Sequence, residues 1–273
     1  MKIISNPFAL KEELAKRSGS IGFVPTMGAL HEGHLTLIKN ARIENDIVVV
    51  SIFVNPTQFL EGEDLEKYPR KDEADKKICK LAGVDILFFP QVADIYTHDE
   101  VKIHAPDVRG YILEGYTRPG HFNGVLTVVM KLLNIVMPTR AYFGKKDAQQ
   151  LHLIQLMVKQ YFMDVKIVPV DTVRESDGLA QSSRNVYLSP TQREAALKIP
   201  ASLYAAAKAV SRGERECRKI RQDMLDILSP LEIGYVAILN RDFEYIHEIE
   251  IGNSIILVEA VVGKTRLLDN IWL

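Results

Sequence analysis

Two histidines in a short glycine-containing segment are the residues of this sequence best suited to chemistry. The segment is PTMGALHEGH, Pro25–His34, and its histidines are His31 and His34. A strand-like run precedes it and an amphipathic helix pattern follows, which predicts the kind of turn at which open parallel sheets bind ligands. Gly28 and Gly33 let a ligand approach the backbone, and the helix N-terminus favours an anion. Two imidazole donors there can follow charge that develops on a phosphate.

Other interpretations of these histidines, and other nucleotide-binding patterns, fit the sequence less well. Two surface histidines that only cap a helix would need neither the glycines nor the preceding strand. Zinc ligation is disfavoured because their spacing is i,i+3 and no third ligand is evident. Gly263-Lys264-Thr265 is similar to the end of a P-loop, but no helix pattern follows, so a hairpin turn is predicted. No G-x-G-x-x-G follows a strand pattern, so a dinucleotide fingerprint is missing.

A lysine-rich turn and a serine-rich loop offer further groups for phosphates. GKKDAQQ, Gly144–Gln150, follows a short strand pattern and leads into a helix pattern. A lysine there suits a polyphosphate and an aspartate suits ribose hydroxyls; in isolation the segment is equally compatible with an exposed charged loop. QSSRN, Gln181–Asn185, adds two hydroxyls and an arginine that can hold phosphate oxygens. That loop alone is a weak signal, because serine is common in turns and loops.

Two more segments could bind the uncharged part of a substrate or enclose it. NPTQF, Asn55–Phe59, ends the most apolar strand pattern, and its amides would orient hydroxyls or a carboxylate without changing the local charge. A strand end terminated by proline is the alternative. RPGHF, Arg118–Phe122, precedes a helix pattern and is equally compatible with a lid and with a helix cap.

The elements that must position these segments alternate in period as far as residue 170. Short apolar runs predict strands at 21–26, 47–54, 84–89, 141–143 and 165–170. Helical periodicity predicts helices at 33–44, 71–82, 123–136 and 148–162. This alternation favours a Rossmann-like parallel sheet with helices on both faces and right-handed crossovers.

The pattern changes after residue 172. Ser189-Pro190 predicts the start of a long helix over 190–211, because serine caps helices and proline suits their first turn. A helix at 214–228 and strands at 235–239, 254–262 and 265–268 follow. The sequence therefore predicts two domains, 1–172 with the parallel sheet and 173–273 as a smaller α+β C-terminal domain.

The amino-acid composition excludes several classes of protein. The 273 residues include 34 Lys+Arg and 35 Asp+Glu, a net charge of −1 that gives no electrostatic case for nucleic acid. The 47% hydrophobic content excludes intrinsic disorder. Two cysteines, Cys79 and Cys217, are too few for a disulfide scaffold. With no signal-peptide pattern and no long apolar run, the sequence predicts a soluble cytoplasmic protein without a membrane partner.

Together the motifs resemble those of the pantoate–β-alanine ligases. HxGH alone would indicate only the wider nucleotidyltransferase superfamily, whereas NPTQF, KDAQQ and SSRN together narrow the resemblance to this family. Lys145, where Glu is usual, and Gln181, where Leu is usual, depart from the family pattern. From Val24 to at least Asn270 the motifs stand in the family's order: PTMGALHEGH, VSIFVNPTQF, YPR at 68–70, RPGHF, YFGKKDAQQ, SSRN and RLLDN.

The resemblance implies a two-step ATP-dependent ligase. ATP and (R)-pantoate would give pantoyl adenylate and pyrophosphate, and β-alanine would then displace AMP to give pantothenate. It further implies a Rossmann-like nucleotide- and pantoate-binding domain, a C-terminal lid domain and a homodimer. ATP enters as a substrate with Mg²⁺, and no cofactor is permanently bound. A sensor that kept the pocket but lost the reaction, and a transferase that uses another acceptor, are the alternatives.

The resemblance also assigns residues to roles. The implied catalytic residues are His31, His34, Lys146 and Arg184, with His34 as the general acid or charge stabiliser. The implied ATP-binding residues are Met27, Gly28, Ala29, Leu30, His31, Glu32, Gly33, His34, Gly144, Lys145, Lys146, Asp147, Val173, Gln181, Ser182, Ser183 and Arg184. Asn55, Gln58 and Gln150 are the implied substrate-binding residues. Mg²⁺ would be held mainly by ATP oxygens, and a protein ligand among Asp72, Glu73 and Asp75, with Asp75 preferred, is a guess.

Overall fold

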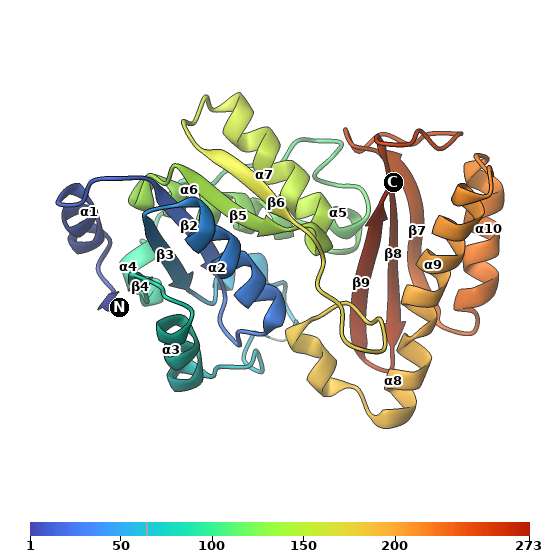
Figure 1. The fold of residues 1–273 in the computed structure, drawn as a ribbon, viewed down its shortest axis with the longest axis horizontal. Coiled ribbons are helices and arrows are strands. Elements are labelled where there is room, and N and C mark those ends of the chain that lie inside the picture. Colours follow the sequence, from blue (N-terminus) through green and yellow to red (C-terminus); the bar gives the residue numbers. More distant parts are fainter. Residues whose placement is uncertain (64) are drawn as a thin grey trace. The chain divides into compact units, whose positions relative to one another are not determined.

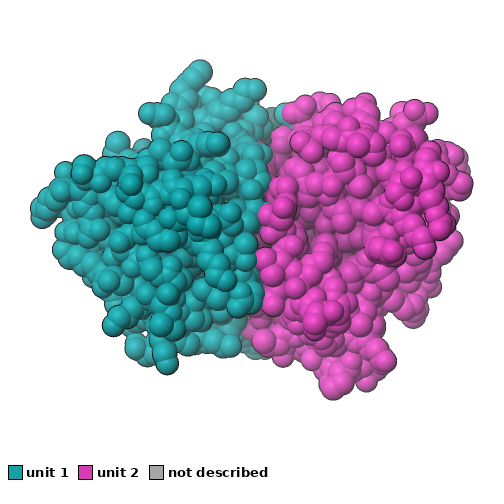
Figure 2. Space-filling view, in the orientation of Figure 1, with its two compact units in different colours: residues 1–144, 153–170 teal, residues 145–152, 171–273 magenta. Residues whose placement is uncertain are grey.

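The computed structural model describes residues 1–63 and 65–273, which divide into two compact units (Figure 2). Unit 1 comprises residues 1–144 and 153–170, and unit 2 comprises residues 145–152 and 171–273. Lys145–Gln150 of the lysine-rich turn therefore belong to the same unit as the C-terminal residues, whereas Gly144 belongs to unit 1. The predicted assignment of 1–172 to substrate binding and of 173–273 to a lid stays a prediction.

Unit 1 is built on a six-stranded parallel sheet with the strand order β1-β4-β3-β2-β5-β6. All six residues of the run IVVVSI in β3 are buried, as expected for a strand covered on both faces. This sheet confirms the predicted Rossmann-like class. The strands are β1 (Lys2–Ile4), β2 (Ile21–Thr26), β3 (Ile47–Ile52), β4 (Ile86–Phe88), β5 (Arg140–Gly144) and β6 (Lys166–Val170).

Helices cover both faces of this sheet (Figure 1). Side chains of α2 and α3 pack with Val48 and Val50 on one face, whereas α6 contacts β2 and α1. The N-terminal β1 and α1 were not among the predicted elements, because β1 is only three residues long and two of them are exposed. The helices are α1 (Pro7–Ala15), α2 (Glu32–Glu44), α3 (Asp72–Leu81), α4 (Val92–Ile95), α5 (Glu114–Thr117), α6 (His121–Val136) and α7 (Ala148–Gln160), whose first turn falls in unit 2.

The strand order reverses between β2 and β5. From β2 the chain proceeds through β3 and β4 in one direction, whereas β5 and β6 lie on the other side of β2. Phe23 of β2 pairs with Ala141 of β5, so the carboxyl ends of these two strands are neighbours. Open α/β sheets bind ligands at such a switch point, outside the carboxyl ends of the strands. The PTMGALHEGH segment begins at this edge.

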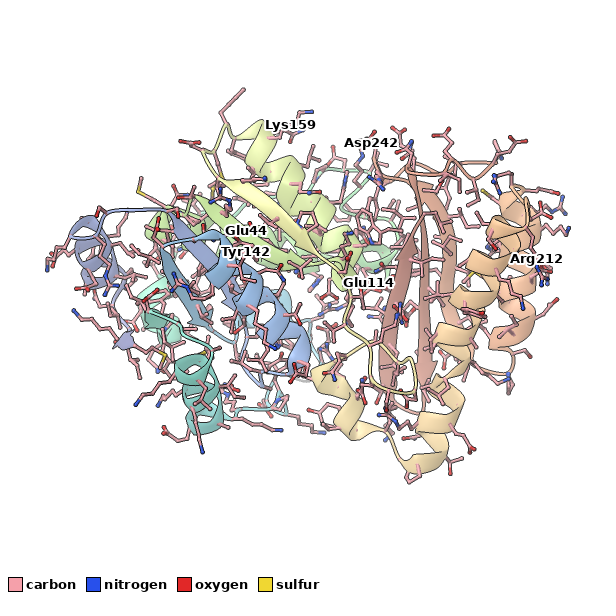
Figure 3. All side chains as sticks on the ribbon, viewed as in Figure 1. Glu44, Glu114, Tyr142, Lys159, Arg212 and Asp242 are labelled. Carbon is pink, nitrogen blue, oxygen red and sulfur yellow. The ribbon has the colours of Figure 1, made fainter. Side chains whose placement is uncertain are left out.

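A buried tyrosine ties the C-terminal end of α2 to β5. The Tyr142 hydroxyl donates to Glu44 Oε2 at 2.9 Å and accepts from Asn45 Nδ2 at 2.7 Å. Figure 3 shows the labelled Glu44 and Tyr142 side chains next to each other. Burial raises the pKa of Tyr142 to about 12, so the phenol stays neutral at physiological pH. The helix that starts at the histidines is thereby fixed at its far end.

Unit 2 combines helices with a three-stranded antiparallel sheet in the order β7-β8-β9. Its core includes Ile199 and Leu203 of α9 and Ile220 of α10, packed with Ile256 and Val258 of β8. The elements are α8 (Pro190–Ala196), α9 (Lys198–Ser211), α10 (Cys217–Leu228), β7 (Glu232–Asn240), β8 (Ser254–Val262) and β9 (Thr265–Trp272).

The single helix predicted over 190–211 is wrong, because the chain forms α8 and α9 there. Pro200 has no N–H to donate to the Ala196 carbonyl, so the helix restarts and proline falls in the first turn of α9. The predicted start is confirmed, since Ser189 caps α8 and forms a capping box with Gln192. Gly263, at φ +66°, lies in the tight turn between β8 and β9, which confirms the predicted hairpin.

No helix among residues 1–63 and 65–273 is long and apolar enough to cross a membrane.

Candidate active site

The two histidines cap the start of α2 and fix each other. His31 is the N-cap residue: its Nδ1 accepts from the Gly33 N–H at 3.2 Å, while its own N–H donates to His34 Nδ1 at 3.3 Å. The two rings lie 4.1 Å apart between centroids. Because each Nδ1 accepts a hydrogen bond, the proton of each neutral imidazole sits on Nε2. The backbone thus selects the tautomer that presents an Nε2–H donor, at the N-terminus of a helix that favours anions.

The turn that leads to the histidines is held by a carboxylate from α3. Asp75 accepts from the Ala29 and Leu30 N–H groups at 2.7 and 2.9 Å, and it is 1% exposed. Gly28 and Ala29 adopt φ values of +86° and +50°, a left-handed conformation that costs Ala29 strain. The carboxylate compensates this cost by binding two backbone donors. Asp75 therefore sets the path of the chain into His31.

Asp75 was also the preferred guess for a magnesium ligand. Both of its oxygens accept backbone N–H groups, and burial raises its pKa, opposed by those two hydrogen bonds. In the described part of the chain, no group of three or more His, Cys, Asp or Glu is placed to hold a metal ion. Coordination of magnesium by Asp75 stays a prediction.

Gln58 is oriented by a buried asparagine at the end of β3. Asn55, 1% exposed, donates from Nδ2 to Gln58 Oε1 at 3.0 Å and to the Gly124 carbonyl at 3.2 Å. Its Oδ1 accepts from the Tyr96 hydroxyl at 2.7 Å. Gln58 Nε2 in turn contacts Met27 Sδ at 3.2 Å, which joins this segment to the histidine turn. Asn55 thus supports Gln58, and its direct contact with a substrate stays a prediction.

The RPGHF segment anchors the main chain of Gln58. Arg118 forms a paired interaction with Glu63, both N–O distances being 2.6 Å, and also donates to the Gln58 carbonyl at 3.2 Å. His121 Nδ1 donates to the same carbonyl at 2.7 Å, while its Nε2 accepts from Arg118. Burial acts to raise the pKa of Glu63, but the hydrogen bonds from Arg118 and the Leu60 N–H, with the charges of Arg118 and His121, together hold the pKa below its usual value. Of the two interpretations of this segment, the structure favours a helix start, with Gly120 as N-cap of α6.

Gly124 is a structural residue that the sequence analysis missed. An added Cβ would overlap the Thr57 carbonyl, so α6 and the 3-10 turn η1 (Pro56–Gln58) approach closely only because Gly124 has no side chain. This approach brings the Gly124 carbonyl to Asn55. A glycine inside a helix pattern was the available signal, because such a glycine often marks a close backbone contact.

In unit 2, the two lysines of the turn η2 (Lys145–Asp147) have different partners. Lys145 Nζ pairs with Asp171 Oδ1 at 2.6 Å and lies 5.5 Å from the centre of the Trp272 ring. Lys146 Nζ lies 3.4 Å from Asp147 Oδ1, a longer and weaker contact. The charge that Lys145 adds relative to the family pattern is therefore offset by Asp171, and Lys146 is the better candidate for a phosphate. Gln149 is buried and Gln150 is half-buried in the first turn of α7.

The SSRN loop forms a short 3-10 turn, η3 (Ser183–Tyr187), also in unit 2. Ser182 is its N-cap, with Oγ accepting from the Arg184 N–H at 3.3 Å. The buried Asn185 donates from Nδ2 to Glu175 Oε1 at 2.6 Å and to the Ala180 carbonyl at 3.0 Å. Asn185 thereby ties the loop to the preceding residues 174–180, while Gln181 bonds through its N–H to the Val173 carbonyl at 2.9 Å.

The structure brings the predicted site residues together in two groups, one in each unit. Unit 1 holds the histidine turn with Met27, Asn55 and Gln58. Unit 2 holds the lysine turn with Gln150, and the SSRN loop with Val173. Residues to which the sequence analysis gave no supporting role hold both groups in place: Asp75, Tyr96 and Gly124 in unit 1, and Asp171 in unit 2.

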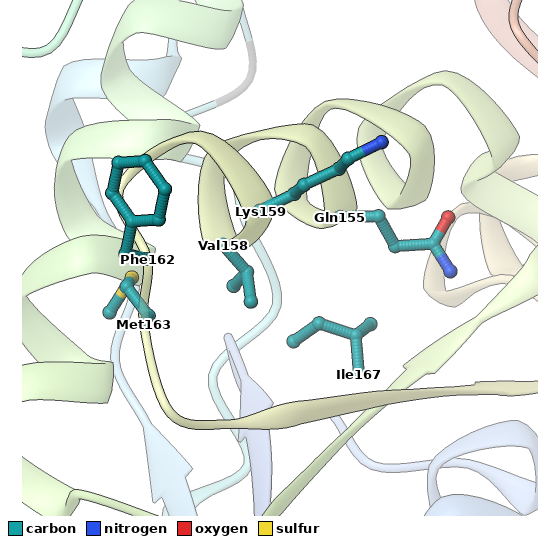
Figure 4. Close-up of a pocket in the computed structure, with 6 residues that line it drawn as sticks. All are labelled: Gln155, Val158, Lys159, Phe162, Met163 and Ile167. Carbon is teal, nitrogen blue, oxygen red and sulfur yellow. The ribbon is translucent and has the colours of Figure 1, made fainter.

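A surface hollow of about 310 Å³ lies away from these motifs, beside the C-terminal part of α7 (Figure 4). Four of its six lining residues are apolar, and Gln155 and Lys159 are the two with polar side chains. Small-molecule sites need several convergent polar groups, so this hollow does not compete with the motif residues as a candidate active site. It is lined by Gln155, Val158, Lys159, Phe162, Met163 and Ile167.

Comparison with known proteins decides the family. The profile described as Pantoate-beta-alanine ligase matches residues 2–272. The chain belongs to the pantoate–β-alanine ligase family. The pantothenate synthetase of Sulfurimonas denitrificans is 68% identical over 273 residues, which cover 100% of both chains.

Solved structures agree with this assignment to the ligase family. The chain matches the pantothenate synthetase of Thermus thermophilus with a TM-score of 0.95 and 40% identity, covering 99% of each chain. It matches the pantoate–β-alanine ligase of Francisella tularensis, solved in complex with beta-gamma ATP and β-alanine, with a TM-score of 0.82 and 37% identity over 100% of this chain and 97% of that one. The predicted enzyme class, a ligase that joins pantoate to β-alanine, and the predicted fold class are confirmed.

Proposed function

We propose that this ligase works in two steps through a pantoyl-adenylate intermediate. The mutual capping of His31 and His34 carries the proposal, because it fixes two Nε2–H donors at the switch point of a parallel sheet. That arrangement suits the phosphates of a nucleotide. The Francisella relative in complex with beta-gamma ATP and β-alanine supports ATP as a substrate here.

In the first step the pantoate carboxylate attacks the α-phosphorus of ATP. A new O–P bond forms, the bond to the β-phosphate breaks, and its electron pair leaves with pyrophosphate. Negative charge therefore grows on the α-phosphate oxygens and on the leaving group. His34 Nε2–H and the Lys146 ammonium would stabilise this charge, with His31, Ser182, Ser183 and Arg184 as further phosphate ligands. No covalent enzyme nucleophile is needed, because positioning and electrostatics supply the catalysis.

In the second step the neutral amine of β-alanine attacks the acyl carbon, AMP leaves with the electrons of the broken C–O bond, and the new amide nitrogen loses one proton to solvent. Gly144 and Asp147 would hold the ribose, and Gln58 and Gln150 the pantoyl group. Both amides can donate to a carboxylate and accept from hydroxyls without adding charge. The contacts of Gln58 with Asn55 and Met27 fix its side chain before substrate arrives, which lowers the entropy cost of binding.

A pyrophosphate-release assay tests the two-step reaction. With ATP and pantoate but no β-alanine, we expect one burst of pyrophosphate close in amount to the enzyme present. Sustained turnover should begin only when β-alanine is added. Pyrophosphate release that does not depend on pantoate would indicate another acceptor. The absence of release with every combination of ATP, pantoate and β-alanine would indicate a protein that only binds nucleotide.

Replacing Gln58 with leucine is expected to weaken pantoate binding by about 1–3 kcal/mol, because polar partners in the pocket lose a hydrogen bond. ATP affinity should stay close to that of the parent protein. Titration calorimetry with each substrate measures both values, and Gln150→Leu should behave alike. Gln155→Leu, at an exposed position beside the surface hollow, is the matched control. A fall in ATP affinity with pantoate affinity preserved would show that the assignment is wrong.

Residues 173–273 are proposed to act as a lid. An acyl adenylate hydrolyses in water, so the enzyme must shield it until β-alanine enters. We expect ATP and pantoate together to slow hydrogen exchange across residues 173–187, and Arg184→Ala to increase the share of adenylate lost to hydrolysis. Unchanged exchange in this segment, together with normal partitioning in the variant, would rule the lid out.

Three further assignments complete the proposal. Mg²⁺ would arrive on the ATP phosphates, because its octahedral preference favours phosphate oxygens and water. A cytoplasmic location fits Cys79 and Cys217, which are free and buried thiols. Assembly as a homodimer is the expectation carried by the family.

A further inference from the structure

Two adjacent polar residues near the end of β9, Asp269 and Asn270, have no role in the function described so far. Both belong to the RLLDN segment, and each is only 3% exposed. Burying polar side chains costs free energy unless they are hydrogen-bonded, so their partners explain why they are there. Neighbouring residues of a strand point to opposite faces of the sheet, so the pair can hold two different segments.

Asn270 holds the lysine turn. Its Nδ2 donates to the Lys145 carbonyl at 2.9 Å and to the Lys146 carbonyl at 2.7 Å. Its Oδ1 accepts from Trp272 Nε1 at 2.9 Å, which fixes the orientation of the amide. The Trp272 ring in turn lies under the Lys145 ammonium, which also pairs with Asp171. Both polar atoms of the Asn270 amide are thus hydrogen-bonded, so the backbone of the turn has a defined position.

Asp269 holds the segment that leads to the SSRN loop. Its oxygens accept from Arg174 Nη1 at 2.6 Å and Nη2 at 3.0 Å, a bidentate pair. Arg174 also donates to the Gly178 carbonyl at 3.1 Å, which closes residues 174–178 into a compact turn. Through Asn185, which bonds to the Ala180 carbonyl, this turn continues into the loop that contains Ser182 and Arg184.

We propose that Asp269 and Asn270 are positioning residues. From adjacent positions on one strand they hold the lysine turn and the SSRN loop in place to bind the phosphates of ATP. This inference rests on the proposed function, in which Lys146 and Arg184 stabilise phosphate charge. A three-residue turn such as η2 has few internal constraints, so the two hydrogen bonds from Asn270 decide where the Lys146 side chain starts. Misplacing a catalytic group by about 1 Å can cost on the order of 10²-fold in rate.

The test is a double-mutant cycle between Asn270→Ala and Lys146→Ala, measured as single-turnover formation of pantoyl adenylate. Asn270→Ala alone is expected to slow this step by ~10–100-fold. In the Lys146→Ala background the same change should have little further effect, because a positioning residue acts through the group it positions. A merely structural loss would slow both backgrounds by the same factor, and that result would overturn the proposal.

Two more variants keep the test decisive if Asn270→Ala folds poorly. Trp272→Phe removes the indole N–H that orients Asn270 but keeps an aromatic ring, so a smaller loss that also vanishes in the Lys146→Ala background is expected. Asn253→Ala, whose side chain donates to Glu250 elsewhere in unit 2, is the matched control and should keep the parent rate. If the Lys146→Ala variant keeps the parent rate, the proposed role of that lysine is wrong. If the Lys146→Ala variant is slow but the Asn270→Ala and Trp272→Phe variants keep the parent rate, only the proposed positioning role is wrong.

Discussion

Replacing His34 with alanine is expected to slow pantoyl-adenylate formation by roughly 10²–10³-fold, the scale of losing one donor to a transition state. The His34 ring has two nitrogen atoms with different roles, and this change removes both. Its Nδ1 accepts the His31 N–H and so helps to cap α2, whereas its Nε2–H is the proposed donor to the phosphate. Single-turnover kinetics with ATP and pantoate measures the step directly.

His34→Asn separates the cap from the donor. The Asn Oδ1 atom takes nearly the place of Nδ1 and can accept the His31 N–H, but nothing replaces Nε2. We therefore expect His34→Asn to keep the parent's thermal stability and yet to lose as much rate as His34→Ala. His98→Ala, at an exposed histidine of the same unit, is the control. A rate within threefold of the parent for His34→Asn would remove His34 from the reaction.

Replacing Lys146 with alanine is expected to cause a loss of similar size, roughly 10²–10³-fold in adenylate formation, because a cation beside the developing charge is removed. Lys145→Ala provides the comparison one residue away. The Lys145 ammonium is paired with Asp171 at 2.6 Å and lies against the Trp272 ring, so its removal should cost far less. Equal losses for the two lysines would show that the turn needs net charge rather than Lys146 itself.

The His34→Ala and Lys146→Ala losses are not expected to add. If both groups stabilise the same growing charge, the second deletion removes less than the first, and the double variant falls short of the product of the two single effects. Full additivity would mean that the histidine and the lysine act on separate events. Measuring adenylate formation and its reaction with β-alanine separately would then show which step each residue serves.

Local sequence patterns were sufficient for most of the regular elements and for the motifs that are proposed to carry the chemistry. The buried run of β3, the start of α2 after the glycine turn and the Ser189 cap of α8 depend on periodicity and on neighbouring residues, which a sequence displays directly. The same patterns predicted the hairpin at Gly263. The patterns missed the short β1 and the α1 that follows it, and at residues 190–211 a single proline inside the pattern made the predicted helix wrong.

The supports of the site came only from the tertiary structure. Asp75 binds the N–H of Ala29 across 46 residues of sequence, and Asn270 binds the Lys145 carbonyl across 125. Such contacts join one side chain to the backbone of a distant segment. They therefore produce neither a periodic pattern nor a local composition from which the contact could be predicted. The sequence by itself determined the candidate reacting groups, because their types and spacing are local properties. Their orientation depends on a strand order and on buried hydrogen bonds that exist only once distant segments have packed together.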